Sequence, residues 1–223
     1  MRRRRGMLLG WIVVGLYAAA MAVVTIQELG DDAGRPPADE TDPAEAFAAA
    51  WERFRQATFV ATGTYERRSD VTGAVLTSDD VVAQRPPRRV HRQLGGVDGR
   101  DDDRLIVCPA PPADDAERAE PCRLGPPGGV TYAESVKREV AGIRSLTQGR
   151  SPLYRVTQPE PGCFALELLR IDPRAPFGVE ASFCFAAESG ALVARRVQHE
   201  GGIVEVLTVT SVRSQVTDAD LEP

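Results

Sequence analysis

The stretch that decides the fold is Thr58–Gln93, with the sequence TFVATGTYERRSDVTGAVLTSDDVVAQRPPRRVHRQ. Its first part alternates strictly, so that Phe59 and Tyr65 share one face of an extended strand while Val60 lies on the other. A Val-Thr-Gly turn and the Pro86-Pro87 corner divide the rest. Alternation with period two, bounded by Gly and Pro, is typical of antiparallel strands with one face on a core. The stretch therefore predicts three such strands.

Two helices and more strands extend this pattern. Asp42 before Pro43 predicts the start of one helix, and Thr131 with Glu134 three residues later predicts a second. Asp98 to Asp103 are expected to form a loop. Further strands are predicted at 104–108, 153–158, 163–169, 178–185, 191–198 and 203–212. The predicted fold class is α+β: a curled antiparallel sheet of roughly nine strands, wrapped as a half-open barrel over two helices.

The N-terminus predicts a membrane anchor. Residues 7–26 are uncharged and mostly apolar, long enough to span a bilayer, and Arg2–Arg5 precede them. The positive-inside rule then places the N-terminus in the cytoplasm and the rest of the chain outside it. The alternative is a signal peptide cleaved after Ala20-Met21-Ala22, which would release a secreted protein. The apolar run continues through Val23–Ile26, which favours the anchor.

Composition divides the chain into segments and excludes one class of partner. Beyond Arg5 the chain carries 23 Lys and Arg against 32 Asp and Glu, a net charge of −9. An acidic domain is a poor partner for nucleic acid. The predicted segments are a basic cytoplasmic end (1–6), a transmembrane anchor (7–26), a flexible linker (27–41), an extracytoplasmic domain (42–215) and a C-terminal tail (216–223).

Four cysteines, all downstream of the apolar segment, suit an oxidising compartment. Cys108 and Cys122 flank a proline-rich loop that a disulfide would close. The second pair follows from strand register: placing Phe164 opposite Phe183 matches two apolar faces and also places Cys163 opposite Cys184. The predicted disulfides are Cys108–Cys122 and Cys163–Cys184.

No motif of catalysis, cofactor binding or metal binding stands out in the sequence, so we expect a protein that is not an enzyme. His91 and His199 are interpreted as solvated strand residues, and Arg55 as lying on the wet side of the first helix. A curled sheet over two helices leaves a concave inner face that can hold a ligand. The residues predicted to line that cavity are Trp51, Phe54, Phe59, Tyr65, Phe164 and Phe183.

Basic residues concentrate around the third predicted strand. They are interpreted as a charged edge strand that prevents edge-to-edge pairing, or else as an edge that contacts lipid headgroups or a protein partner. The residues of this predicted edge are Arg85, Arg88, Arg89 and Arg92.

A helix containing Trp51, followed by FVATGTYERRSDVTGAVLTSDDVVAQRPPRRVHRQLGG at 59–96, resembles the LolA/LppX-like superfamily of lipoprotein-localisation factors. In pattern it is closest to the N-terminal domain of RseB/MucB-type regulators. The shared features are the strand with Gly63 and Tyr65, the hairpin and the proline corner. The resemblance implies a half-open barrel that holds acyl chains or senses lipoproteins for an anti-sigma factor. The chain departs from that pattern in having no lipobox cysteine and in carrying two disulfides.

The resulting functional hypothesis is a membrane-anchored, extracytoplasmic module that binds a lipid, a lipoprotein or another apolar ligand in its concave sheet. The alternative is a protein–protein sensor or regulator of envelope signalling. The two hypotheses differ in which surface binds: the inner wall of the sheet in the first, and the arginine-rich edge in the second.

Overall fold

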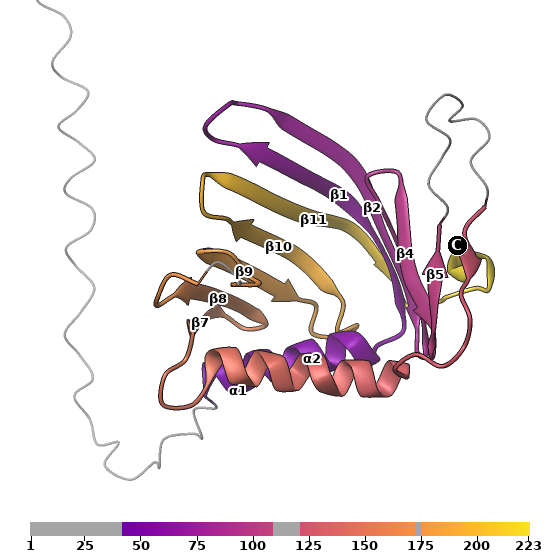
Figure 1. Cartoon of the computed structure of the whole chain (residues 1–223), viewed down its shortest axis with the longest axis horizontal. Helices are drawn as coiled ribbons and strands as arrows, with labels where there is room; N and C mark the ends of the chain where they lie inside the picture. Colours follow the sequence, from indigo (N-terminus) through magenta and orange to yellow (C-terminus); the bar gives the residue numbers. More distant parts are fainter. Residues whose placement is uncertain (1–41, 109–120, 173–174) are drawn as a thin grey trace, which may run out of the picture. The chain divides into compact units, whose positions relative to one another are not determined.

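Figure 1 shows the computed structural model of the chain, which describes residues 42–108, 121–172 and 175–223. These residues belong to one compact unit, Thr41–Pro223. Within them, no helix is long and apolar enough to cross a membrane. The predicted basic end, anchor and linker lie outside the described residues.

Both helices begin where their capping residues predict. The side chain of Asp42 accepts a hydrogen bond from the backbone N–H of Ala44 at 3.1 Å. The Thr131 hydroxyl accepts one from the N–H of Glu134 at 3.3 Å. These bonds satisfy amide groups that a first helical turn leaves unpaired. The helices are α1 (Pro43–Gln56) and α2 (Tyr132–Thr147).

One antiparallel sheet of eleven strands covers the helices, in the order β6-β5-β4-β3-β2-β1-β11-β10-β9-β8-β7. The sheet is strongly curved, and its two ends, β6 and β7, are not paired to each other (Figure 1). The strands are β1 (Phe59–Ser69), β2 (Val75–Arg85), β3 (Arg88–Gln93), β4 (Gly96–Asp101), β5 (Arg104–Val107), β6 (Arg123–Leu124), β7 (Tyr154–Glu160), β8 (Cys163–Leu168), β9 (Glu180–Phe185), β10 (Leu192–Gln198) and β11 (Ile203–Arg213). The predicted half-open sheet over two helices is confirmed.

A bulge in the central strand pair bends the sheet. The register between β1 and β11 shifts between Thr62 and Gly63. At this point the two backbones approach closely, since a Cβ on Gly63 would lie 2.3 Å from the carbonyl oxygen of Thr208. Bulges bend a strand and increase its twist, and glycine permits the close approach.

Two sequence predictions about the sheet are wrong. Most of the loop expected at 98–103 belongs to strand β4, which pairs along the whole of β3. The third strand is therefore not an edge, because β3 lies between β2 and β4. Gly and Asp have low strand propensity, but pairing with a neighbour overrides propensity in a sheet.

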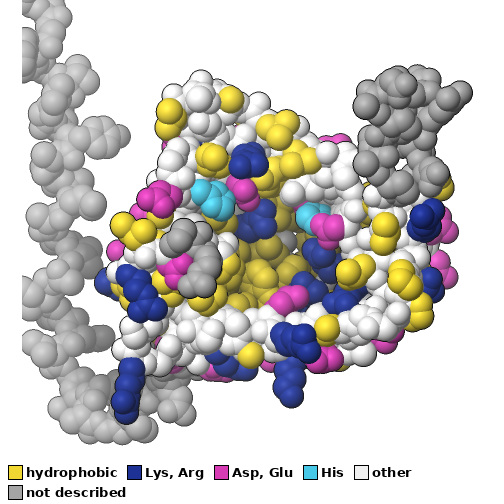
Figure 2. Space-filling view, viewed as in Figure 1, with side chains coloured by type: hydrophobic (Ala, Val, Ile, Leu, Met, Phe, Trp, Pro, Cys, Tyr) yellow, Lys and Arg dark blue, Asp and Glu magenta, His cyan; other side chains and the backbone are white. Residues whose placement is uncertain are grey.

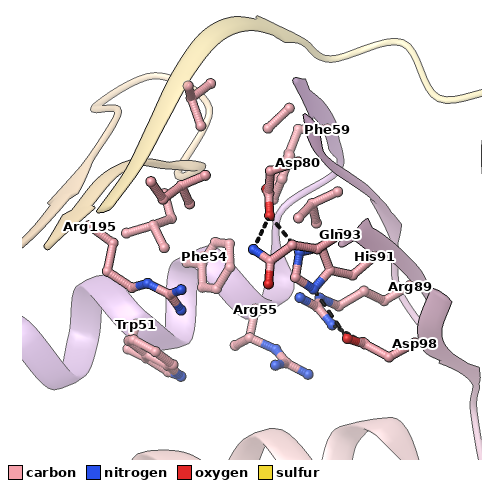
Figure 3. Close-up of a pocket in the computed structure, with 15 residues that line it drawn as sticks. Trp51, Phe54, Arg55, Phe59, Asp80, Arg89, His91, Gln93, Asp98 and Arg195 are labelled. Carbon is pink, nitrogen blue, oxygen red and sulfur yellow. Dashed lines mark hydrogen bonds and ion pairs between the residues drawn. The ribbon is translucent and has the colours of Figure 1, made fainter. Parts of the chain in front are cut away.

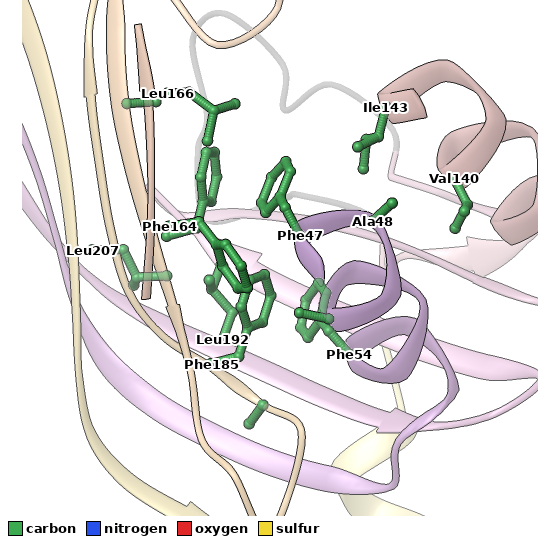
Figure 4. Packing of buried hydrophobic residues seen from close by; sticks show 14 of the residues in the cluster. Phe47, Ala48, Phe54, Val140, Ile143, Phe164, Leu166, Phe185, Leu192 and Leu207 are labelled. Carbon is green, nitrogen blue, oxygen red and sulfur yellow. The ribbon is translucent and has the colours of Figure 1, made fainter. Parts of the chain in front are cut away.

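An aromatic cluster fills the space between α1 and the sheet (Figure 4). Phe47 is fully buried, and its ring centroid lies 5.4 Å from those of both Phe164 and Phe183. On the other side of α1, Ala48 faces Val140 and Ile143 of α2 (Figure 4). Helix α1 thus lies between the sheet and α2, and the apolar stripes predicted for both helices form one core.

The structure contains both predicted disulfides. Cys163 lies opposite Cys184 in the β8–β9 pair, and Phe164 lies opposite Phe183, as the register argument requires. Cys108 is bonded to Cys122, which joins the end of β5 to the start of β6.

Candidate functional site

The concave face of the sheet carries a pocket of about 210 Å³, visible in Figure 2 as a hollow with a hydrophobic floor and charged walls. Pockets for drug-sized ligands occupy about 300–1,000 Å³. This pocket therefore fits a small molecule, or one end of a longer one. Its apolar lining consists of Trp51, Phe54, Phe59, Ala61, Val82, Leu192, Leu207 and Val209.

The C-terminal end of α1 forms one side of the pocket and is held by β2. The side-chain amide of Gln84 donates to the carbonyl oxygens of Phe54 at 2.6 Å, Arg55 at 3.1 Å and Ala57 at 2.9 Å. The hydroxyl of Tyr132 in α2 also donates to the Arg55 carbonyl. The last carbonyls of a helix lack partners within the helix. Gln84 supplies hydrogen-bond donors to these carbonyls and so fixes the directions in which the side chains of Phe54 and Arg55 point.

Strand β3 supplies the polar wall. Because side chains alternate along a strand, Arg89, His91 and Gln93 share the concave face and line the pocket (Figure 3). Arg88 and Arg92 project from the opposite, convex face. The run RRVHRQ is therefore divided between two environments.

His91 is held between two carboxylates. Its Nε2 lies 2.8 Å from Asp80 and its Nδ1 lies 3.2 Å from Asp98 (Figure 3). Gln93 donates to the same Asp80 carboxylate at 2.6 Å, and Asp80 is only 2% exposed. Burial alone would lower the pKa of His91, but the hydrogen bonds to the two carboxylates outweigh it and raise that pKa above its ordinary value. The hydrogen bond from His91 in turn lowers the pKa of Asp98.

Three arginines from three different elements line the same pocket: Arg55 of α1, Arg89 of β3 and Arg195 of β10. Burial lowers the pKa of the Arg89 guanidinium, and the neighbouring positive charge of Arg55 lowers it further. Each guanidinium has one carboxylate nearby among the described residues. The pairs are Arg55–Glu139 at 3.1 Å, Arg89–Asp98 at 3.3 Å and Arg195–Glu205 at 3.7 Å.

The structure places the six predicted lining residues in three different locations. Trp51, Phe54 and Phe59 line the pocket. Phe164 and Phe183 instead pack against Phe47 in the core, because α1 covers that part of the concave face. The sixth predicted residue, Tyr65, is buried but is not among the residues that line the pocket.

Two residues that the sequence predicts to be exposed to solvent line the pocket. The predicted position of Arg55 on the wet side of its helix is wrong, because its side chain is only 11% exposed. A signal was available: Arg55 follows Trp51 by four residues, which places both on one helix face. The interpretation of His91 as a solvated residue is wrong, because the hydrogen bonds to Asp80 and Asp98 hold it in the pocket wall. The contact with Asp98 depends on β4, a strand that the sequence does not predict.

Three of the four predicted edge arginines contact the C-terminal tail of the same chain. Arg85 pairs with Asp218, Arg88 donates to the Leu221 carbonyl at 3.4 Å, and Arg92 donates to the Asp220 carbonyl at 3.3 Å. The prediction that the tail lies outside the domain is wrong, because the tail packs on the convex face. Leu221, in the short helix η2 (Ala219–Leu221), is 1% exposed and closes a second small core with Val60, Ala83 and Val90.

Within the described part of the chain, no group of three or more His, Cys, Asp or Glu side chains is placed to hold a metal ion. The pocket lining therefore offers apolar contacts, guanidinium groups and one histidine with its carboxylates.

The fold and the pocket define a class: an α+β domain whose curved antiparallel sheet covers two helices and leaves an open pocket with an apolar floor on its concave side. No protein-family model matches the chain, and no curated protein matches its sequence.

Solved structures do resemble it. A LolA superfamily protein from Nitrosomonas europaea is 10% identical, with a TM-score of 0.34 over 81% of this chain and 97% of that one. The MucA/MucB complex of Pseudomonas aeruginosa contains a chain that is 16% identical, with a TM-score of 0.42 over 82% of this chain and 61% of that one. A DUF1329 family protein from Desulfovibrio piger is 12% identical, with a TM-score of 0.30 over 82% of this chain and 98% of that one. Both groups that the sequence resembles are thus among the similar structures.

Proposed function

We propose that the domain is a binding protein that holds an apolar ligand in the pocket on its concave sheet face. The observation that carries the proposal is the hydrophobic floor of that pocket, which opens to solvent between charged walls (Figure 2). Burying apolar ligand surface against such a floor contributes about 25 cal/mol for each Å² removed from water.

The pocket size narrows the ligand. At about 210 Å³, the pocket holds one hydrocarbon chain or part of one. A lipid with several acyl chains would place most of its bulk outside. The ligand class that fits is a single-chain molecule, or a lipid or lipoprotein that inserts one chain.

The state of His91 supports binding over catalysis. An imidazole acts as a general base when one ring nitrogen can reach the substrate. In this pocket Nε2 contacts Asp80 and Nδ1 contacts Asp98, so both ring nitrogens already have partners. His91 is thus placed to organise the wall rather than to move a proton.

The proposal also includes a location for the protein in the cell. Residues 7–26 anchor the protein in a membrane with the domain outside the cytoplasm, where both disulfides persist. The alternative, a sensor that binds a protein through an arginine-rich edge, is the weaker proposal. Arg85, Arg88 and Arg92 contact the chain's own tail instead of offering a free surface.

Tryptophan fluorescence tests the proposal directly, because Trp11 and Trp51 are the two tryptophans of the chain and Trp51 lines the pocket. The full chain with Trp11→Phe, held in phosphatidylcholine nanodiscs, would report on the pocket alone. We expect a neutral quencher, ω-bromododecanol, to quench Trp51 saturably.

Adding Val209→Phe should weaken that quenching by narrowing the pocket, whereas the matched change Val71→Phe at an exposed hairpin tip should not. Quenching that never saturates, or that Val209→Phe leaves unchanged, would rule the pocket out as the binding site.

A further inference from the structure

The pocket has a positive wall as well as an apolar floor. The side chains of Arg55, Arg89 and Arg195 reach it from a helix and two strands that are far apart in the sequence (Figure 3). Figure 2 shows basic side chains inside the hollow as well as on the outer surface of the domain. A pocket for a purely apolar ligand has no need of three guanidinium groups.

Part of the hydrogen-bonding capacity of these arginines is unused. A guanidinium group has five N–H donors. Among the described residues, the Nε atoms of Arg55, Arg89 and Arg195 are buried without any hydrogen-bond partner. Each group has a single carboxylate within 4.0 Å, and for Arg195 that carboxylate is 3.7 Å away. Unpaired buried donors are costly.

Arg55 and Arg89 also repel each other. Burial lowers the pKa of Arg89 and the charge of Arg55 lowers it further, so the two guanidinium groups interact as like charges. Like charges so placed are stabilised when an anion binds between them. Arginine suits this role, because its planar fork matches the two oxygens of a carboxylate or phosphate.

The carboxylates around the pocket already have partners. Asp80 accepts from Gln93 and contacts His91, and Asp98 contacts both His91 and Arg89. Asp98 stands at the rim, with 70% of its side chain exposed. The two other acids that pair with the arginines, Glu139 and Glu205, are not part of the lining. The groups that face the interior of the pocket are thus mainly cationic.

We infer that the pocket binds a single-chain amphiphile with an anionic oxygen headgroup, a carboxylate or a phosphate, and that Arg55, Arg89 and Arg195 bind that headgroup. This inference rests on the proposed function and adds the orientation of the ligand. The chain lies on the floor formed by residues such as Phe54 and Leu207, and the head lies against the guanidinium groups.

Three quenchers with the same chain test the inference in the Trp11→Phe protein in phosphatidylcholine nanodiscs: ω-bromododecanoate, ω-bromododecyl phosphate and ω-bromododecanol. We expect at least one anionic quencher to bind about tenfold more tightly than the alcohol, because charge-assisted hydrogen bonds are roughly twice as strong as neutral ones. The comparison of carboxylate with phosphate identifies the headgroup.

Variants on opposite faces of β3 provide the control. Arg89→Gln should remove most of the preference for the anion, and Arg88→Gln, on the convex face, should leave it intact. Arg195→Gln, on another strand, should reproduce the Arg89→Gln result, and urea denaturation of each variant would show whether the fold is retained.

The outcomes separate the two proposals. If all three compounds bind equally, with Arg89→Gln and Arg195→Gln having no effect, the headgroup site is wrong and the apolar pocket remains. If none of the compounds quenches Trp51 saturably, the proposed function itself fails. Binding of the anions that survives both arginine substitutions would also overturn the headgroup site.

Discussion

Both faces of strand β3 carry arginine, but the arginines of the two faces differ in their partners. On the convex face, Arg88 and Arg92 donate to carbonyls of the C-terminal tail, and Val90 packs beneath Leu221. On the concave face, Arg89 keeps a buried Nε without a partner and faces a pocket. One face is complete within the chain, and the other offers donors that the chain does not use. Where a chain leaves arginine donors unused inside a cavity, a ligand is the natural acceptor.

This difference separates stability from binding. The tail covers the convex face with its own apolar residue and its own carbonyls, so changes there should affect folding and leave ligand binding alone. Changes on the concave face should affect binding, except where the residue also holds a structural element in place.

Leu221→Ala should give the largest loss of stability. Leu221 is 1% exposed and packs with Val60, Ala83 and Val90. Replacing a buried leucine with alanine costs about 2–5 kcal/mol, and we expect the lower half of that range because the tail can shift to close the cavity. Urea unfolding followed by circular dichroism measures the loss, and quenching of Trp51 should stay the same. A loss below about 0.5 kcal/mol, the range of an ordinary surface substitution, would show that the tail does not complete the convex face.

Gln84→Leu should affect both properties. It removes the three hydrogen bonds to the carbonyls of Phe54, Arg55 and Ala57, of which the Arg55 carbonyl keeps its bond from Tyr132 and the Phe54 bond is the buried one. An unsatisfied buried group costs about 1–3 kcal/mol, so we expect a loss of about 2 kcal/mol together with weaker binding. Gln56→Leu, which removes an exposed bond to Glu52 on the same helix, is the control and should cost a few tenths at most. Unchanged binding in Gln84→Leu would mean that the end of α1 does not shape the pocket.

Local patterns in the sequence predict the frame of this molecule well. The alternation in β1, the caps at Asp42 and Thr131, and the Cys163–Cys184 register are each determined by residues that lie within one element or one hairpin. For β8 and β9, the register that places the apolar residues opposite one another also places the two cysteines opposite each other.

The parts that could not be predicted depend on distant contacts. The run GVDGRD has no apolar alternation, and it becomes a strand because β3 offers it a partner. The tail reads as polar, and its one buried residue, Leu221, has a place only on a convex face formed by β1, β2 and β3. The pocket wall could not be predicted for a similar reason. Asp80, His91 and Asp98 come from three strands, so no pattern within a single strand indicates that they meet.

The concave face should also respond to pH. The pKa of His91 is raised in the folded protein, so its protonated form contributes stability that is fully present below the unfolded pKa, about 6.5. That contribution is lost as pH rises through the folded pKa. The charged groups that face His91 are Asp80, Asp98 and Arg89. Asp98 contributes stability in a separate pH range. Because its pKa is lowered in the folded protein, that contribution is lost only as the pH falls through the folded pKa of Asp98.

Denaturation between pH 6 and pH 9 measures this effect. We expect the stability of the wild-type chain to fall across that range by less than the Gln84→Leu effect, and that of His91→Gln to vary less. If the pH profile of His91→Gln were identical to that of the wild type, the contacts with Asp80 and Asp98 would not raise the pKa of His91.

The smallest expected effects compare Arg88→Gln with Arg89→Gln, adjacent residues on opposite faces. Arg88 lies 3.4 Å from Asp101 and is partly exposed, so its loss should cost about 1 kcal/mol or less. Arg89 is more buried and is repelled by Arg55, while its partner Asp98 is exposed enough for water to replace the pair. Arg89→Gln should therefore cost less than Arg88→Gln or even stabilise the ligand-free protein.

A double-mutant cycle tests whether repulsion between Arg55 and Arg89 is the reason for the small or stabilising effect of Arg89→Gln. If Arg55 and Arg89 repel each other, removing either one should relieve the other, so the coupling between Arg55→Gln and Arg89→Gln should oppose folding in the ligand-free protein. Saturating ω-bromododecanoate should reverse the sign of the coupling, because an anion bound by both groups makes each depend on the other. The pair of Arg88→Gln with Arg55→Gln, on opposite faces, should show no coupling in either condition. A favourable coupling between Arg55 and Arg89 without ligand would mean that the concave face, like the convex one, is already satisfied by the chain itself.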